Sequence, residues 1–157
     1  MTRTETFQST AAAASSLRLV VDTNTVLALW MFRDPVLEGL RTWIESARPG
    51  LFAREDTLAE LAAVLGYAQF GHPESVQTTL LANYRNRVQC LPTSTTELAL
   101  PACKDPDDQK FLEVAWQASA SHLLTRDRAL LAMARRREIR ERFRILSPES
   151  FSALHAL

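Results

Sequence analysis

The chain has 157 residues, of which 46% are hydrophobic and 23% are charged, and its formal net charge at pH 7 is zero. A chain of this length can bury a sizeable core as one domain without disulfides or a structural metal. No apolar run approaches the roughly 18 residues of a membrane span, so we do not expect a membrane protein, and we expect a cytoplasmic location.

Strands and helices alternate along the predicted chain. Residues 1–16 are polar and small, which predicts a disordered tail before a single domain at 17–157. Strands are predicted at 17–22, 51–53, 88–92, 121–125 and 143–146. Helices are predicted at 23–32, 35–47, 56–70, 73–87, from 105 onward, at 128–143 and at 147–157. This order predicts an α/β fold, a three-layer α/β/α sandwich around a mainly parallel central sheet.

Two common kinds of site are absent from the sequence. The four glycines form neither GxxxxGK[ST] nor GxGxxG, which excludes the usual phosphate-binding loops. The three histidines are scattered, so local spacing supports no HExxH zinc site and no histidine-based triad. Any catalytic chemistry is therefore expected from carboxylates.

Four acidic residues lie at predicted strand ends or near predicted helix starts. Asp22 ends the first strand, and Asp127 follows the strand at 121–125. Ligands of open parallel sheets bind beyond the carboxyl ends of the strands, which is where these two acids are expected. Glu60 and Asp108 fall near the beginnings of two helices.

Each acid also has a purely local explanation. Asp22 and Asp127 could simply cap the helices that follow them. Glu60 stands three residues after Thr57, the spacing of a T-x-x-E capping box. The stretch DPDDQKFLEVA resembles an ordinary helix start with Asp105 as the cap. The functional interpretation therefore depends on whether the acids converge.

Taken together, the four acids favour a divalent metal site. Neighbouring carboxylates repel one another unless a cation or protons compensate their charge. Mg²⁺ and Mn²⁺ take oxygen ligands, which suits three or four carboxylates without a histidine. Such ions activate water and stabilise charge on a phosphoryl group. The pattern predicts metal-dependent phosphodiester cleavage.

A basic segment follows the last of these acids. Between positions 126 and 144 the chain has eight arginines and three acidic residues. A solvated helix face explains this composition, but arginine also binds phosphates well, so a nucleic-acid partner is allowed. The candidate RNA-binding residues are Arg126, Arg128, Arg135 and Arg136.

As a set, these motifs resemble the PIN-domain ribonucleases, many of which are toxins of bacterial toxin–antitoxin pairs. The four motifs of the family are similar, in order, to VVDTN at Val20, LAELAAVL at Leu58, DPDDQKFLEVA at Asp105 and LLTRDRALL at Leu123. The closing strand and helix of the family are similar to RILSPESF. The resemblance runs from about residue 17 to residue 151.

The resemblance implies a site, a reaction and partners. The implied metal-binding and catalytic acids are Asp22, Glu60, Asp108 and Asp127, with Asn24 and Thr125 supporting them by hydrogen bonds. Asp105 and Asp107 compete for the third position, and Asp108 is preferred because the apolar helix positions then match those of the family. The implied reaction is hydrolysis of RNA with Mg²⁺ or Mn²⁺, leaving a 5′-phosphate. The implied partners are a cognate antitoxin and a second copy of the chain in a homodimer.

Two other functions remain open from the sequence. A PIN-like domain could bind RNA or a protein partner without cutting. An aspartate-based phosphatase also places an acid after its first strand, but such a nucleophile usually has a second Asp two residues later, where this chain has Asn24.

Overall fold

The computed structural model describes residues 17–93 and 98–157, and within them five strands form one sheet in the order β3-β2-β1-β4-β5. The strands are β1 (Arg18–Val21), β2 (Gly50–Arg54), β3 (Gln89–Leu91), β4 (His122–Leu124) and β5 (Arg144–Leu146). Each lies at a predicted position, and every pairing is parallel, which confirms the predicted α/β class. The tail predicted for residues 1–16 lies outside the described residues.

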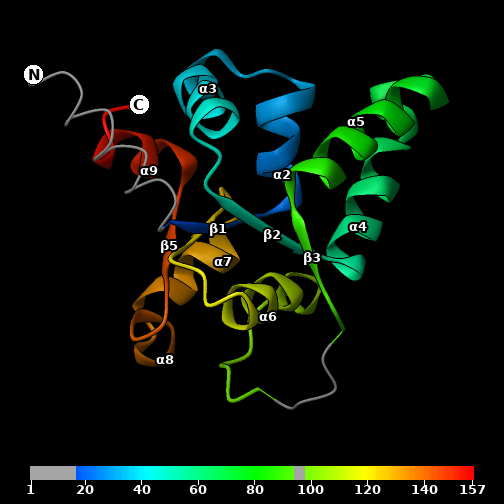
Figure 1. Cartoon of the computed structure of the whole chain (residues 1–157). Helices are drawn as coiled ribbons and strands as arrows, with labels where there is room; N and C mark the ends of the chain where they lie inside the picture. The colour runs from blue at the N-terminus through cyan, green and yellow to red at the C-terminus, as the bar shows by residue number, and fades with distance from the viewer. Residues whose placement is uncertain (1–16, 94–97) are drawn as a thin grey trace, which may run out of the picture.

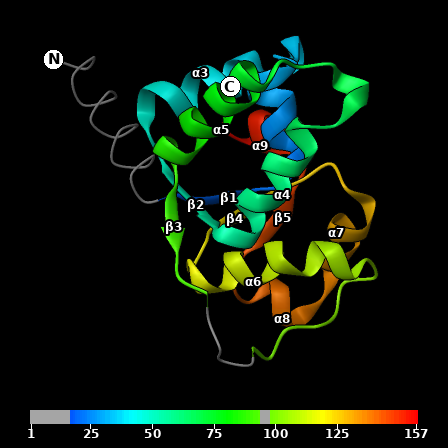
Figure 2. The same ribbon diagram turned by 90° about the vertical axis from the view of Figure 1, so that its right-hand side faces the viewer.

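Helices cover both faces of the sheet (Figures 1 and 2). One face carries α2 (Thr23–Val26), α3 (Glu38–Ala47), α4 (Glu55–Leu65), α5 (Glu74–Arg87) and α9 (Pro148–Leu154). The other face carries α6 (Gln109–Gln117), α7 (Arg128–Ala132) and α8 (Arg137–Arg140). Short π or 3₁₀ segments connect them: η1 (Leu27–Met31), η2 (Pro35–Leu37), η3 (Ala68–Phe70), η4 (Pro106–Asp108) and η5 (Met133–Arg135). None of the helices in the described ranges is long and apolar enough to cross a membrane.

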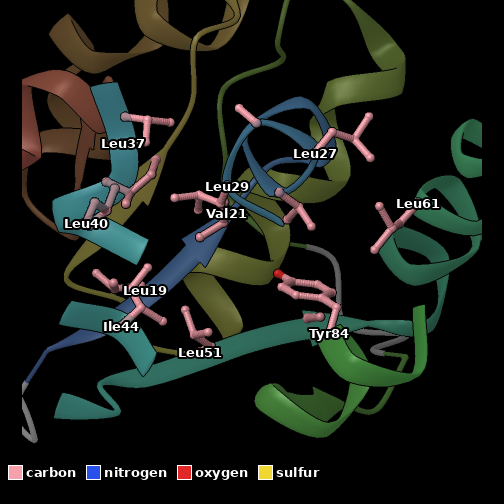
Figure 3. Close-up of a cluster of buried hydrophobic side chains, with 14 of the residues drawn as sticks. Leu19, Val21, Leu27, Leu29, Leu37, Leu40, Ile44, Leu51, Leu61 and Tyr84 are labelled. Atoms are coloured by element: carbon pink, nitrogen blue, oxygen red, sulfur yellow. The ribbon is translucent and has the colours of Figure 1, made fainter. Parts of the chain in front are cut away.

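The central strand β1 is buried on both faces, as its unbroken apolar run predicts. Successive side chains of a strand point to opposite faces. Leu19 and Val21 accordingly belong to a first buried hydrophobic cluster, which includes residues of α3 and α5. Val20 belongs to a second cluster on the opposite face, which includes residues of α6. In the first cluster Leu19 and Val21 lie with Leu51 of β2 and Tyr84 of α5 (Figure 3). Two packed cores thus fix β1 from both sides, and with it the residues at its carboxyl end.

Two predicted helices are shorter than the apolar pattern indicated. The helix expected at 56–70 ends at Leu65, where Gly66 caps the last carbonyls, and the chain then forms the short turn η3. The helix expected at 128–143 divides into α7, η5 and α8 because Arg136 adopts an extended conformation with ψ of 131°. Leu130 and Ile139, on the two separated pieces, both reach full burial in the same core. Tertiary packing therefore outweighed helix propensity in this segment.

Candidate active site

The four predicted acids line one pocket at the carboxyl ends of β1 and β4. The volume of this pocket is about 300 Å³. Its lining residues are Asp22, Thr23, Asn24, Glu60, Val64, Tyr67, Gln69, Phe70, Asp108, Phe111 and Asp127. Segments as far apart as residues 22 and 127 contribute to it because β1 and β4 are neighbours in the parallel sheet. The acids are thus brought together as the topology requires.

Asp22 and Asp127 are joined through the hydroxyl of Thr125. Asp22 is only 4% exposed, and its Oδ2 accepts a hydrogen bond of 2.5 Å from Thr125 Oγ1. The same Oγ1 accepts a 2.9 Å hydrogen bond from the backbone N–H of Asp127. Both acids also cap helices, since Asp22 accepts from Thr25 N–H at 3.0 Å and Asp127 accepts from Leu130 N–H at 3.1 Å. Capping and pocket lining are therefore compatible roles for these two residues.

Glu60 does not belong to a capping box, so the T-x-x-E interpretation is wrong. Helix α4 begins three residues earlier than that motif requires, and Thr57 Oγ1 bonds the backbone of Arg54 instead. Glu60 lies inside the helix and turns toward the pocket, where its carboxylate accepts a hydrogen bond from Thr23 Oγ1. Its other oxygen pairs with Lys110 Nζ at 2.9 Å. Local capping therefore provides no explanation for this acid.

Among the three acids of the third motif, Asp108 is the one that lines the pocket. Asp105 is exposed and caps η4 by accepting from Asp107 N–H at 3.0 Å. Asp107 is exposed as well, whereas Asp108 is half-buried. Its Oδ2 atom is buried and has no hydrogen-bond partner within the described part of the chain. The geometry favours Asp108 over its two neighbours as the functional acid.

The pocket accumulates negative charge that the described residues only partly compensate. Burial, reinforced by the charges of Asp127, Asp105 and Asp22, raises the pKa of Asp108 to about 7. Burial also raises the pKa of Asp22, by more than its hydrogen bonds to Thr125 and Thr25 lower it. Both shifts mean that the ionised forms of Asp22 and Asp108 are destabilised unless a cation or a proton compensates their charge.

This excess charge predicts a pH-dependent stability in the metal-free protein. The folded-state pKa of Asp108, about 7, lies above its ordinary value of 3.8, so the folded chain holds this proton more tightly than the unfolded chain. The stability contributed by Asp108 is therefore lost as the pH rises from about 4 to about 7. Above pH 7, Asp108→Asn should raise the free energy of unfolding by about 1–2 kcal/mol, a value reduced for solvent screening of a partly exposed side chain.

The measurement is urea unfolding in chelator across that pH range. Asp107→Asn, in the exposed neighbour, is the matched control and should follow the wild-type profile. Parallel profiles for wild type and Asp108→Asn would contradict the prediction, since the titration of Asp108 would then not be linked to folding.

The donor set fits a hard divalent cation. All four acids offer oxygen atoms, and one oxygen of Asp108 is buried without a hydrogen-bond partner among the residues that the structure describes. Within residues 17–93 and 98–157, no three His, Cys, Asp or Glu side chains already form a group that could hold a metal ion. Among the described residues, the ion pair of Lys110 with Glu60 partly offsets the charge of these four acids. The residue types at the pocket therefore fit a hard divalent cation.

The other sequence-predicted residues divide into those at the pocket and those away from it. Asn24 is exposed and lines the pocket. The four candidate arginines are absent from its described lining. Arg126 instead donates to Asp34 at 2.9 Å and to Glu149 at 2.7 Å, joining η2 and α9 to the end of β4. The remaining three, Arg128, Arg135 and Arg136, are exposed, and their contact with RNA stays a prediction.

Sequence reasoning did not assign Thr23, Lys110, Tyr67 or Phe70 to the site. Thr23 directly follows Asp22 in the first motif, and Lys110 comes two residues after Asp108 in the third, so their places within the motifs could have indicated both. Tyr67 and Phe70 fall in the segment that was expected to be helical, and no local signal placed them beside the acids.

Most of the chain is similar to one protein family. A family model described as "PIN domain" matches residues 18–129, more than two thirds of the chain. The matched segment extends from β1 into the start of α7 and includes all four pocket acids. No curated protein matches the chain.

Proposed function

Because this chain belongs to the PIN domain family, a family of nucleases, we propose that it is a metal-dependent ribonuclease that hydrolyses phosphodiester bonds of RNA. The observation that supports this proposal best is the convergence of four carboxylates on one pocket, where a buried oxygen of Asp108 has no hydrogen-bond partner in the described ranges. Such a concentration of acids is unfavourable for folding by itself, which favours a functional reason for it.

Asp22, Asp108 and Asp127 are the residues that would hold the ion, with Glu60 completing the site directly or through water. When bound there, Mg²⁺ or Mn²⁺ would supply an activated water and stabilise negative charge on the phosphoryl group during displacement. The ligand atoms are oxygens throughout, in keeping with the preference of both ions.

The surrounding residues orient these acids. The Thr125 hydroxyl donates to Asp22 and accepts from the backbone of Asp127, so it fixes the two acids relative to each other. Thr23 and Lys110 hold Glu60 against the pocket wall. Partners of this kind keep metal ligands in place and are costly to lose.

The role in the cell is a further part of the proposal. We propose that the protein is the toxin of a toxin–antitoxin pair, with a cognate antitoxin that masks the pocket, and that it forms a homodimer. The support is the likeness of its four motifs to those of PIN-domain toxins, in the same order.

The decisive experiment is incubation of the purified protein with a mixed RNA pool in Mg²⁺, in Mn²⁺ or in chelator. We expect cleavage with either ion, products that carry a 5′-phosphate, and no cleavage in chelator. Failure of demonstrably folded protein to cut with either ion would favour the alternative of a catalytically silent domain that binds RNA or a protein partner.

A further inference from the structure

One lysine is tied directly to the acids of the carboxylate pocket. Glu60 belongs to α4 and Lys110 to α6, two helices that are in contact (Figure 2). The Nζ atom of Lys110 lies 2.9 Å from Oε1 of Glu60 and also donates to the backbone carbonyl of Asp107. The side chain of Lys110 is 18% exposed and that of Glu60 is 28% exposed, so salt screens this pair less than a pair on the open surface. The ammonium group is therefore a fixed part of the electrostatics of the pocket.

Lys110 stands at a position where general preferences disfavour a lysine. It is the second residue of α6, and the first turn of a helix favours acidic rather than basic side chains. The sequence contains sixteen arginines and only two lysines. A lysine ammonium is a compact point charge, whereas the guanidinium of arginine is a broad planar fork. A residue that departs from local preference in this way favours a role in the site.

The ion pair divides the four acids into two kinds. Both oxygens of Glu60 are engaged, one by the ammonium of Lys110 and the other by the hydroxyl of Thr23. Among the described residues, no basic side chain pairs with any of the three pocket aspartates. The charge of Glu60 is thus already compensated, and the aspartates are the acids that still need a cation.

A second divalent ion would have to compete with this ammonium group. Sites that use two metal ions hold them about 3.5–4 Å apart, and each ion needs oxygen ligands. Once the three aspartates hold one ion, Glu60 is the remaining acid in the described lining of the pocket. Like charges repel strongly at such short range, so the ammonium of Lys110 excludes a divalent cation from the same carboxylate.

Resting on the metal-dependent nuclease function proposed above, we propose that Lys110 takes the place of a second metal ion, so that the site binds one divalent cation on its three aspartates. Lys110 is then a positioning residue that keeps the carboxylate of Glu60 compensated and apart from the bound ion. Glu60 reaches that ion only through water. Its contribution is to hold the positive charge of the lysine beside the aspartates.

The test counts bound ions and does not depend on cleavage. Mn²⁺ is titrated calorimetrically into the full chain, which should bind one ion as wild type. Lys110→Met removes the charge at similar length and should bind two ions, because Glu60 becomes available to the second. The double variant Glu60→Gln/Lys110→Met removes both charges of the pair and should bind one ion with a nearly unchanged Kd. Lys104→Met, at an exposed lysine, is the matched control and should also bind one.

The double variant leaves no unpaired charge, so it keeps the test decisive even where Lys110→Met alone does not fold. Weakened binding in both variants would show that Lys110 only orients Glu60 as a direct ligand, and it would overturn the proposal. One ion with the wild-type Kd in folded Lys110→Met would also overturn it, as would two ions, or none, in wild type. RNA cleavage is assayed separately, so cleavage by a wild type that binds two ions would refute the role of Lys110 and leave the nuclease intact.

Discussion

Asp22→Asn should lower the kcat/KM of RNA cleavage roughly 10²–10³-fold or more, the range expected when one electrostatic group of an active site is removed. Asp22 is a buried acid at the centre of the sheet, and it touches both Thr25 and Thr125. The amide has the same shape as the carboxylate but carries no charge for a cation. The measurement is the initial rate of cleavage with Mn²⁺ or Mg²⁺ at saturating ion.

The same variant should fold. Burial raises the pKa of Asp22, so replacing its carboxylate with a neutral group removes an unfavourable charge, while the amide oxygen can still accept from Thr25 N–H. Glu38→Gln, on the exposed first turn of α3, is the charge-matched control and should cleave like wild type. Full activity in Asp22→Asn would remove Asp22 from the site and contradict the proposed mechanism.

Mg²⁺ or Mn²⁺ should stabilise the folded protein by about 2.7 kcal/mol when the free ion is at a hundred times its Kd. For a chain of this size that corresponds to a rise in Tm of roughly 5–10 °C. The ion would relieve the repulsion that raises the pKa of Asp108, and it would engage the buried Oδ2 that has no partner in the described residues. Thermal unfolding followed by circular dichroism, with and without the ion, measures the shift.

The control for this prediction is the Asp108→Asn variant, which should lose most of the metal-induced shift while still unfolding cooperatively in chelator, above pH 7 at a higher Tm than wild type. Sodium chloride of equal ionic strength should leave Tm nearly unchanged, which separates specific binding from screening. An equal shift in wild type and Asp108→Asn would place the bound ion elsewhere on the molecule.

The fold could be predicted from the sequence because its signals are local. The unbroken apolar run of β1 and the regular spacing of turns require nothing beyond hydrophobic periodicity. The boundaries of helices were harder to predict, since the end at Leu65 depends on the cap at Gly66, and the break at Arg136 depends on packing. The cap at Gly66 is a local feature, whereas the break at Arg136 depends on packing of Leu130 and Ile139 in a core built from residues distant in the sequence.

The site was predictable only in part, and Glu60 illustrates why. Its T-x-x-E context satisfied a local rule, but the true helix start shifted the cap to Arg54 and left the glutamate free to meet Thr23 and Lys110. The contact between Phe32 and Phe70 gave no signal in the sequence, because these two residues become neighbours only through the tertiary fold.

The hydrogen bond between Thr125 and Asp22 spans 103 positions of the chain, and this separation has a consequence for synthesis on the ribosome. Parallel strands so far apart must close a long loop before they can pair, which makes their association a late event in folding. A nascent chain that has not yet emerged beyond β4 lacks both this hydroxyl and Asp127. If the protein cuts RNA as proposed, it stays harmless to the ribosome and messenger that produce it until most of the chain has been made.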